Sequence, residues 1–300
     1  MQVTVAKTAG FCFGVKRAVD TVMSEADSSG QKIYTYGPII HNSHVVAELE
    51  EKGVKVIESR EELDKLKDCT VVIRSHGVSR EVIDSLDRPG IRLVDLTCPF
   101  VAKIHRIVYE ASKSGSVILV AGNPVHPEVQ GIVGWTVGEC HVVSSVEQLK
   151  EFFDNFYEKN SGQDCLADKK QICMVAQTTF NYEVFKEFVE IIKIMHYNVN
   201  VVDTVCNATR ERQAEARSIA QKVDAMIVIG DRHSSNSQKL YEICQQACKN
   251  TRFIEKLVDL EPVNFQSLCR VGITAGASTP KNIIEEVQNH VRNEFWTNAG

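Results

Sequence analysis

Three cysteines in this chain have the residue type and the spacing to bind one metal centre. Cys12, Cys98 and Cys206 each follow a short apolar run and precede a stretch with the periodicity of a helix. The chain has no Cys-x-x-Cys pair, which excludes a local zinc ribbon. Because the cysteines lie 86 and 108 residues apart, a shared site would have to form from three distant turns.

Three thiolates suit two kinds of centre. They could hold zinc with an open position, or three irons of a [4Fe–4S] cluster whose fourth iron is free. Catalytic zinc sites usually include histidine, so three sulfurs favour the cluster. The alternative is three buried thiols without a metal, since free cysteine is among the most buried residue types. We interpret the other seven of the ten cysteines as structural.

Polar residues recur at a fixed distance after each cysteine, which indicates an internal repeat. A glycine follows each cysteine after 25, 24 and 24 residues, and a polar residue lies four positions beyond it: Gly37 and His41, Gly122 and His126, Gly230 and Ser234. Two positions further come Ser43, Glu128 and Asn236. Each third then ends on a second polar loop, and these loops contain His76, Thr178 and Ser278.

Four short apolar runs in each third predict strands. They begin near Val3, Ile33, Val54 and Val71, near Ile91, Val117, Val142 and Ile172, and near Val199, Met226, Phe253 and Val271. Runs without polar alternation suit strands that are covered on both faces, and the stretches between them have helical spacing. This pattern predicts parallel sheets built from βαβ units, whose ligands bind at the carboxyl ends of the strands.

We therefore predict an α/β fold of three similar small lobes, each a mostly parallel four-stranded sheet with flanking helices. The lobes are expected to span residues 1–97, 98–205 and 206–300, with the N-terminal strand free to pack elsewhere and a C-terminal helix in the third lobe. A polar stretch near 155–170 predicts an exposed loop in the second lobe.

Composition excludes several classes of protein. The net charge is −5, from 34 basic and 39 acidic residues, and the absence of a basic block argues against a nucleic-acid partner. No apolar run approaches the roughly 18 residues needed to cross a bilayer, so no membrane association is expected. No export signal is visible at the N-terminus, and we expect reduced thiols and a cytoplasmic location.

The polar loops carry hydrogen-bond donors near predicted helix starts, where free amides and the helix dipole bind anions. The donors are His41, His76, His126, Ser234, Asn236 and Ser278. They suit a phosphate or diphosphate, although each taken singly could equally cap a helix or have a structural role. Glu128 is the one acid among the repeat positions and could deliver a proton, or merely interact with a helix dipole. Thr178 could position a substrate hydroxyl or relay a proton.

Taken together, these motifs resemble one known family. The chain is similar to the 4-hydroxy-3-methylbut-2-enyl diphosphate reductases, the last enzymes of the methylerythritol phosphate route to isoprenoids. The resemblance rests on segments spread over almost the whole chain: Ala9–Ala18 around Cys12, Gly37–Asn42, Arg74–Gly77, Thr97–Pro99, Gly122–Glu128, Gln177–Thr179, Val205–Thr209, Ser234–Ser237 and Thr274–Ser278.

The resemblance implies a pseudo-three-fold trefoil of lobes around a central [4Fe–4S] cluster held by Cys12, Cys98 and Cys206, with one open iron. It implies that the diphosphate is bound by His41, His76, His126, Ser234, Ser235, Asn236 and Ser278. Glu128 would supply protons, with Thr178 beside the substrate hydroxyl and His126 next to the acid. The products would be isopentenyl and dimethylallyl diphosphate, with electrons from a ferredoxin or flavodoxin and a monomer or homodimer as the working form.

Two other functions remain open from the residues. An iron–sulfur hydro-lyase acting on a phosphorylated small molecule would also use three cysteines and an open iron, but it needs no external reductant. A redox or iron sensor would lose its cluster reversibly, yet it would have little use for Glu128 and six donor side chains.

Overall fold

The computed structural model describes residues 2–28, 30–160, 171–196, 198–260 and 269–296. The chain divides into two compact units, residues 1–58 with 207–300 and residues 59–206. The described strands form three four-stranded sheets, with the orders β1-β12-β10-β11, β3-β2-β4-β5 and β7-β6-β8-β9. All strand pairs within the two units are parallel. The expected three parallel four-stranded sheets with flanking helices are confirmed.

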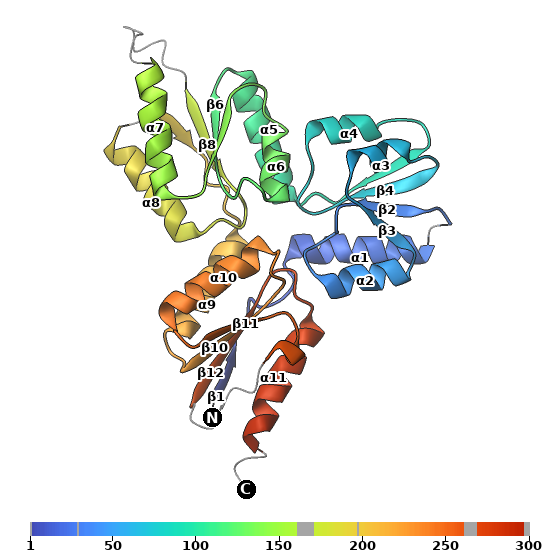
Figure 1. Cartoon of the computed structure of the whole chain (residues 1–300), viewed down its shortest axis with the longest axis vertical. Helices are drawn as coiled ribbons and strands as arrows, with labels where there is room; N and C mark the ends of the chain where they lie inside the picture. The colour runs from blue at the N-terminus through green and yellow to red at the C-terminus, as the bar shows by residue number, and fades with distance from the viewer. Residues whose placement is uncertain (1, 29, 161–170, 197, 261–268, 297–300) are drawn as a thin grey trace. The chain divides into compact units, whose positions relative to one another are not determined.

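The first unit contains one complete sheet, covered by helices on both faces (Figure 1). Its strands are β1 (Gln2–Val5), β12 (Arg270–Ala275), β10 (Ala225–Ile229) and β11 (Thr251–Ile254). Met226 and Val228 face a cluster with α9 (Asn207–Ala220) and α10 (Ser235–Ala247), whereas Ile227 and Ile229 face α11 (Lys281–Trp296). Burial of both faces explains why β10 reads as an uninterrupted apolar run. A short 3-10 helix, Leu257–Asp259, follows β11.

The rest of the first unit is a βαβ segment that follows a long helix in the chain. It comprises α1 (Phe13–Ser28), β2 (Ile33–Tyr36), α2 (Ser43–Glu51) and β3 (Val54–Ile57). Asn42 caps α2 by accepting a hydrogen bond from the Val45 amide at 3.1 Å. The helix therefore begins one residue later, relative to its glycine, than the corresponding helices α6 and α10, which are capped by His126 and Ser234.

The second unit begins with α3 (Arg60–Lys65), β4 (Cys69–Ile73), α4 (Arg80–Leu86) and β5 (Ile91–Asp95). Its complete sheet consists of β6 (Val117–Ala121), β7 (Cys140–Val143), β8 (Ile172–Ala176) and β9 (Val199–Val201). One face packs on α7 (Val146–Asn160) and α8 (Tyr182–Ile194), and the other on α5 (Pro99–Lys113) and α6 (Pro127–Val133) (Figure 1). Each cluster takes alternate residues of β6 and β8, as a doubly covered strand requires.

Two details of the sequence interpretation need correction. The runs near Ile91 and Val199, which we counted as the first strands of their thirds, pair with strands of the preceding third, because β5 lies beside β4 and β9 beside β8. The N-terminal strand β1, which was expected to be free to pack elsewhere, lies beside β12. With β1 counted as the last strand of the third copy, all three sheets have the same strand order. Residues 155–160 are the end of α7 and not a loop, while 161–170 lie outside the described residues. The domain boundaries and the trefoil arrangement stay predictions.

The repeat is visible in the backbone hydrogen bonds. The glycines Gly37, Gly122 and Gly230 donate to the last residue of the neighbouring strand, at 2.7, 2.9 and 2.9 Å. The glycine offsets found in the sequence therefore mark equivalent positions in three sheets. Within the described part of the chain, no helix is both long enough and apolar enough to cross a bilayer.

Gly77 tests how closely the loop after β4 is packed. The φ angle of Gly77 is +69°, and a Cβ there would lie 2.6 Å from Cε1 of His105. Gly115 has a φ of +89° with open space around it. We expect Gly115→Ala to lose about 1 kcal/mol from backbone strain alone, and Gly77→Ala to lose about 3 kcal/mol because overpacking is added. Calorimetric Tm values of both variants check this, and equal losses would contradict the described packing.

Candidate functional site

The three cysteines occupy equivalent places in the structure. Cys12 donates its backbone N–H to the carbonyl of Ala277 at 3.3 Å, Cys98 to Ser75 at 2.9 Å, and Cys206 to Thr178 at 3.0 Å. Each acceptor lies two residues past the end of a strand, namely β12, β4 and β8. Each cysteine is thereby held against a loop that the sequence analysis marked as polar.

The chemistry of the thiols separates these cysteines from others in the chain. All three are partly exposed and in no disulfide, and the side chain of Cys98 makes no capping bond although Cys98 is the N-cap of α5. Burial raises the pKa of Cys140 to about 11 and that of Cys244 to about 12. Burial also raises the pKa of Cys173. Because a metal ligand must be a thiolate, these three are poor ligands and the structural interpretation suits them.

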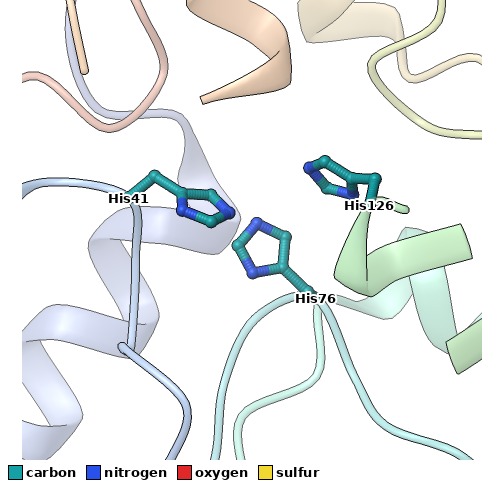
Figure 2. A group of neighbouring side chains, drawn as sticks. All are labelled: His41, His76 and His126. Carbon is teal, nitrogen blue, oxygen red and sulfur yellow. The ribbon is translucent and has the colours of Figure 1, made fainter. Parts of the chain in front are cut away.

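Two of the predicted histidines meet in the second unit. His76 and His126 lie edge to face, with ring centroids 5.4 Å apart and planes at 82° (Figure 2). His76 comes from the loop that accepts the Cys98 hydrogen bond. Figure 2 also labels His41, a half-buried residue that directly precedes the α2 cap Asn42 in the first unit.

His126 is the N-cap of α6, and this role fixes its tautomer. Its Nδ1 accepts a hydrogen bond from the backbone N–H of Glu128 at 3.1 Å. A neutral imidazole whose Nδ1 accepts carries its proton on Nε2. His126 is therefore oriented to donate from Nε2, the atom that faces away from its own helix start. A donor in this position suits an anionic ligand.

Glu128 and Thr178 form a buried pair. Glu128 is only 2% exposed; its Oε1 accepts the Thr178 backbone N–H at 2.6 Å and its Oε2 accepts the Thr178 hydroxyl at 2.8 Å. Burial raises the pKa of Glu128 to about 7, against the two Thr178 hydrogen bonds, which lower it. The carboxyl group is thus close to half protonated at neutral pH, as a general acid requires. The Thr178 carbonyl also accepts the backbone N–H of Cys206, so that Thr178 connects Glu128 with Cys206.

Gln177 is a site residue to which the sequence interpretation gave no role. Its Oε1 accepts the Asn123 backbone N–H at 3.2 Å, and its Nε2 donates to the Thr179 hydroxyl at 3.0 Å. The buried amide thus joins the loop of His126 to the loop of Thr178. Its position directly before Thr178 in a repeated loop was the available signal.

The remaining predicted donors gather at the start of α10 in the first unit. Ser234 caps this helix, its hydroxyl accepting the Ser237 backbone N–H at 3.4 Å, and the partly exposed Ser235 follows it. Nδ2 of Asn236 and Oγ of Ser278 are buried and have no partner among the described residues. A Cβ on Gly276 would lie 3.6 Å from Nδ2 of Asn236, so the Ser278 loop packs against this first turn.

The structure therefore assembles the predicted residues in two groups. Within the second unit, hydrogen bonds and ring contacts connect Glu128, Thr178 and Cys206, and likewise Cys98 with the His76 loop and His76 with His126. Within the first unit, they connect Cys12 with the Ser278 loop, and that loop with the Ser234–Asn236 turn. Buried donors without partners and a buried acid with a raised pKa are both typical of ligand-binding sites.

The chain is similar to known proteins over almost its whole length. The family model described as "LytB protein" matches residues 3–292. The 4-hydroxy-3-methylbut-2-enyl diphosphate reductase of Thermoanaerobacter sp. strain X514 is 43% identical over 294 residues, which cover 97% of either chain. The enzyme of that name from Clostridioides difficile strain 630 is 40% identical over 295 residues, which cover 98% of this chain and all of the relative.

Two solved structures are similar to this one. The E-1-hydroxy-2-methyl-but-2-enyl-4-diphosphate reductase of Plasmodium falciparum superposes with a TM-score of 0.86 at 25% identity, covering 96% of this chain and 87% of that one. An (E)-4-hydroxy-3-methyl-but-2-enyl diphosphate reductase, described as the terminal enzyme of the non-mevalonate pathway, gives 0.66 at 38% identity, covering 98% and 100%.

The burial of Glu128 predicts a particular dependence of stability on pH. Since its pKa is about 7 in the folded state and near 4.5 when exposed, the folded protein holds one more proton between these values. Stability should therefore fall as pH rises from 4.5 to 7, by about 3 kcal/mol from this group, and then level off. Glu128→Gln should remove this fall, because the amide can accept from the Thr178 N–H without ionising.

Urea unfolding at pH 5 and pH 8 measures the effect. Glu187→Gln serves as the control, because it makes the same charge change at an exposed position of α8. Parallel pH dependences of the wild type and Glu128→Gln would show that Glu128 is not held protonated by burial.

Proposed function

We propose that this chain, which belongs to the LytB family and is an oxidoreductase, reduces 4-hydroxy-3-methylbut-2-enyl diphosphate to isopentenyl and dimethylallyl diphosphate. One substrate takes up two electrons and two protons, the allylic C–O bond breaks, and the hydroxyl leaves as water. The observation that carries the proposal is the buried Glu128 held at both oxygens by Thr178, since this reaction needs a proton donor sheltered from bulk water. The relatives named above support the identity of the substrate.

The diphosphate anchor in this proposal is the set of donors from the polar loops. His41, His76, His126, Ser234, Ser235, Asn236 and Ser278 would bind the diphosphate oxygens. Support comes from Nδ2 of Asn236 and Oγ of Ser278, which a bound anion would satisfy, and from the start of the thirteen-residue helix α10 beside them. Binding energy from this anchor would position the far end of the substrate, where the hydroxyl reacts.

Cys12, Cys98 and Cys206 would hold a [4Fe–4S] cluster. The donor set fits: three partly exposed thiols at equivalent turns, each residue donating its backbone N–H to a loop carbonyl and none in a disulfide. Such a cluster, when bound, supplies electrons singly and a Lewis-acidic iron at its open position. The protein's own part is to present three sulfurs and to keep the remaining position accessible to the substrate.

In this proposal the acidic proton of Glu128 would lie on Oε2. Support comes from Oε1, which already accepts the Thr178 backbone N–H, a group that cannot accept a proton in return. Oε2 lies 2.8 Å from the Thr178 hydroxyl, which can accept that proton and donate its own. Glu128 would therefore deliver protons through Thr178, while the cap bond from Glu128 N–H keeps His126 oriented towards the anion.

The same family resemblance supports the remaining parts of the proposal. Electrons would arrive one at a time from a ferredoxin or flavodoxin, and the enzyme would work in the cytoplasm as a monomer or homodimer. These assignments follow from membership of the family and not from a feature of the fold.

The cluster predicts a measurable iron content. Anaerobically purified protein should be brown and contain about four irons per chain. Cys98→Ala should lose most of this iron, whereas Cys269→Ala, at an exposed cysteine outside the three turns, should retain it. Iron, sulfide and zinc analyses measure the outcome, and a colourless zinc protein would overturn the cluster.

The role of Glu128 predicts the effect of one substitution on turnover. Glu128→Gln should lower kcat at least 100-fold with KM changed less than threefold, because the amide binds Thr178 but has no acidic proton. In the wild type, kcat should fall as pH rises through about 7. Thr178→Val should lower kcat, because it removes the hydroxyl through which Glu128 would deliver protons, and should move the fall to higher pH, since the Thr178 hydroxyl bond lowers the pKa of Glu128.

Anaerobic turnover with reduced methyl viologen, with both products quantified, provides the rates. Turnover of Glu128→Gln at the wild-type rate would exclude Glu128 as the proton source. Conversion without consumption of electrons would instead identify a hydro-lyase.

A further inference from the structure

Arg212 is a buried cation to which no role has yet been given. It lies on α9 in the first unit and is only 3% exposed. A guanidinium is always charged, and burying it is costly unless its N–H groups are hydrogen-bonded. An apolar residue would fill the space at lower cost, so the contacts of Arg212 require explanation.

The guanidinium connects the Cys12 loop with the last residue of β12, from which the Ser278 loop continues. Its Nη1 donates to the Ala275 carbonyl at 2.7 Å and its Nη2 donates to the Gly10 carbonyl at 2.9 Å. Ala275 lies three residues before Ser278, and Gly10 lies two residues before Cys12. The direct bond between these loops, from Cys12 N–H to Ala277, is longer at 3.3 Å. The two charge-assisted bonds of Arg212 are therefore the stronger connection.

A second residue of α9 holds the other end of the same loop. Glu215, one turn after Arg212, accepts the backbone N–H groups of Lys7 and Thr8, both at 2.9 Å, and the Thr8 hydroxyl at 2.7 Å. Helix α9 thus binds the loop between β1 and α1 at two points. The Glu215 carboxylate binds the start of the loop, and the Arg212 guanidinium binds it near Cys12. Gly10 has a φ of +98°, and a Cβ there would lie 3.2 Å from Cδ1 of Ile284, so the loop has little room to shift.

We propose that Arg212 is a positioning residue that clamps the Cys12 loop to the end of strand β12, from which the Ser278 loop continues. This proposal rests on the proposed function, in which the Cys12 loop carries a cluster ligand and the Ser278 loop carries a diphosphate donor. The distance between that ligand and that donor then depends on Arg212. A planar guanidinium can reach both carbonyls at once, whereas lysine offers a single point charge. Arg212→Lys should therefore loosen one loop from the other although the charge is kept.

Hydrogen exchange of the full-length protein, followed by mass spectrometry, tests the clamp without any turnover. Arg212→Lys should speed exchange in the peptide that covers residues 6–12 at least tenfold. Arg217→Lys, the same change at a partly exposed position of α9, should leave that peptide unchanged. Wild-type exchange rates in Arg212→Lys would overturn the proposal. If that variant does not fold, Glu215→Gln gives a second test, with faster exchange expected at Lys7 and Thr8.

Turnover and spectroscopy then connect the clamp to the site. In the cluster-loaded enzyme, Arg212→Lys should keep its iron and lower kcat at least tenfold with KM within threefold, because a misplaced reacting end slows the reaction more than binding. The EPR spectrum of its reduced cluster should also change. A lower Tm with wild-type kcat and EPR spectrum would reduce Arg212 to a stabilising role. Absence of iron and turnover in the wild type would refute the proposed function, while the exchange result would still decide the clamp.

Discussion

The site depends on one repeated contact, the hydrogen bond from a cysteine N–H to a carbonyl two residues beyond a strand end. It occurs at Cys12, Cys98 and Cys206, with the same relation to β12, β4 and β8. Parallel strands make this possible, because their carboxyl ends lie at one edge of a sheet and leave carbonyl groups there without ladder partners. Each cysteine that follows a neighbouring strand meets such a carbonyl. The position of each cysteine backbone is thus set by a backbone hydrogen bond.

This arrangement explains why the chemistry resides in loops while the sheets stay apolar. The central strands β6, β8 and β10 are buried along their whole length and offer no polar side chain. Polar groups can only enter where the strands end, and there the helix starts of α6 and α10 supply additional donors. Among the described residues, Glu128 is the one carboxylic acid that is buried, and it is paired there with Thr178. Its burial costs stability at neutral pH and raises the pKa of the carboxyl group to about 7.

The repeat could be read from the sequence because each copy has the same glycine and cysteine offsets. Twelve strand positions and the three sheets follow from those offsets and from apolar runs, whereas the hydrogen bonds between Glu128 and Thr178 could not be read from them. The sequence did not show which strand pairs with the first apolar run of each third. A strand such as β1 that is covered on both faces lacks polar alternation, so its sequence does not say beside which neighbour it lies. Arg212 was missed for a related reason, since a lone arginine within a helical pattern is normally exposed.

The three copies are equivalent in backbone but not in chemistry, and the helix caps show how this arises. In the second and third copies the cap is four residues after the glycine, so Glu128 and Asn236 occupy the second helical position and point inward, buried. In the first copy the cap moves to Asn42, and Ser43 becomes the exposed first residue of α2. At the first of these two positions Glu128 accepts both the N–H and the hydroxyl of Thr178, whereas at the second Nδ2 of Asn236 has no partner among the described residues. The same backbone position thus holds a hydrogen-bonded acid in the second copy and an amide donor in the third.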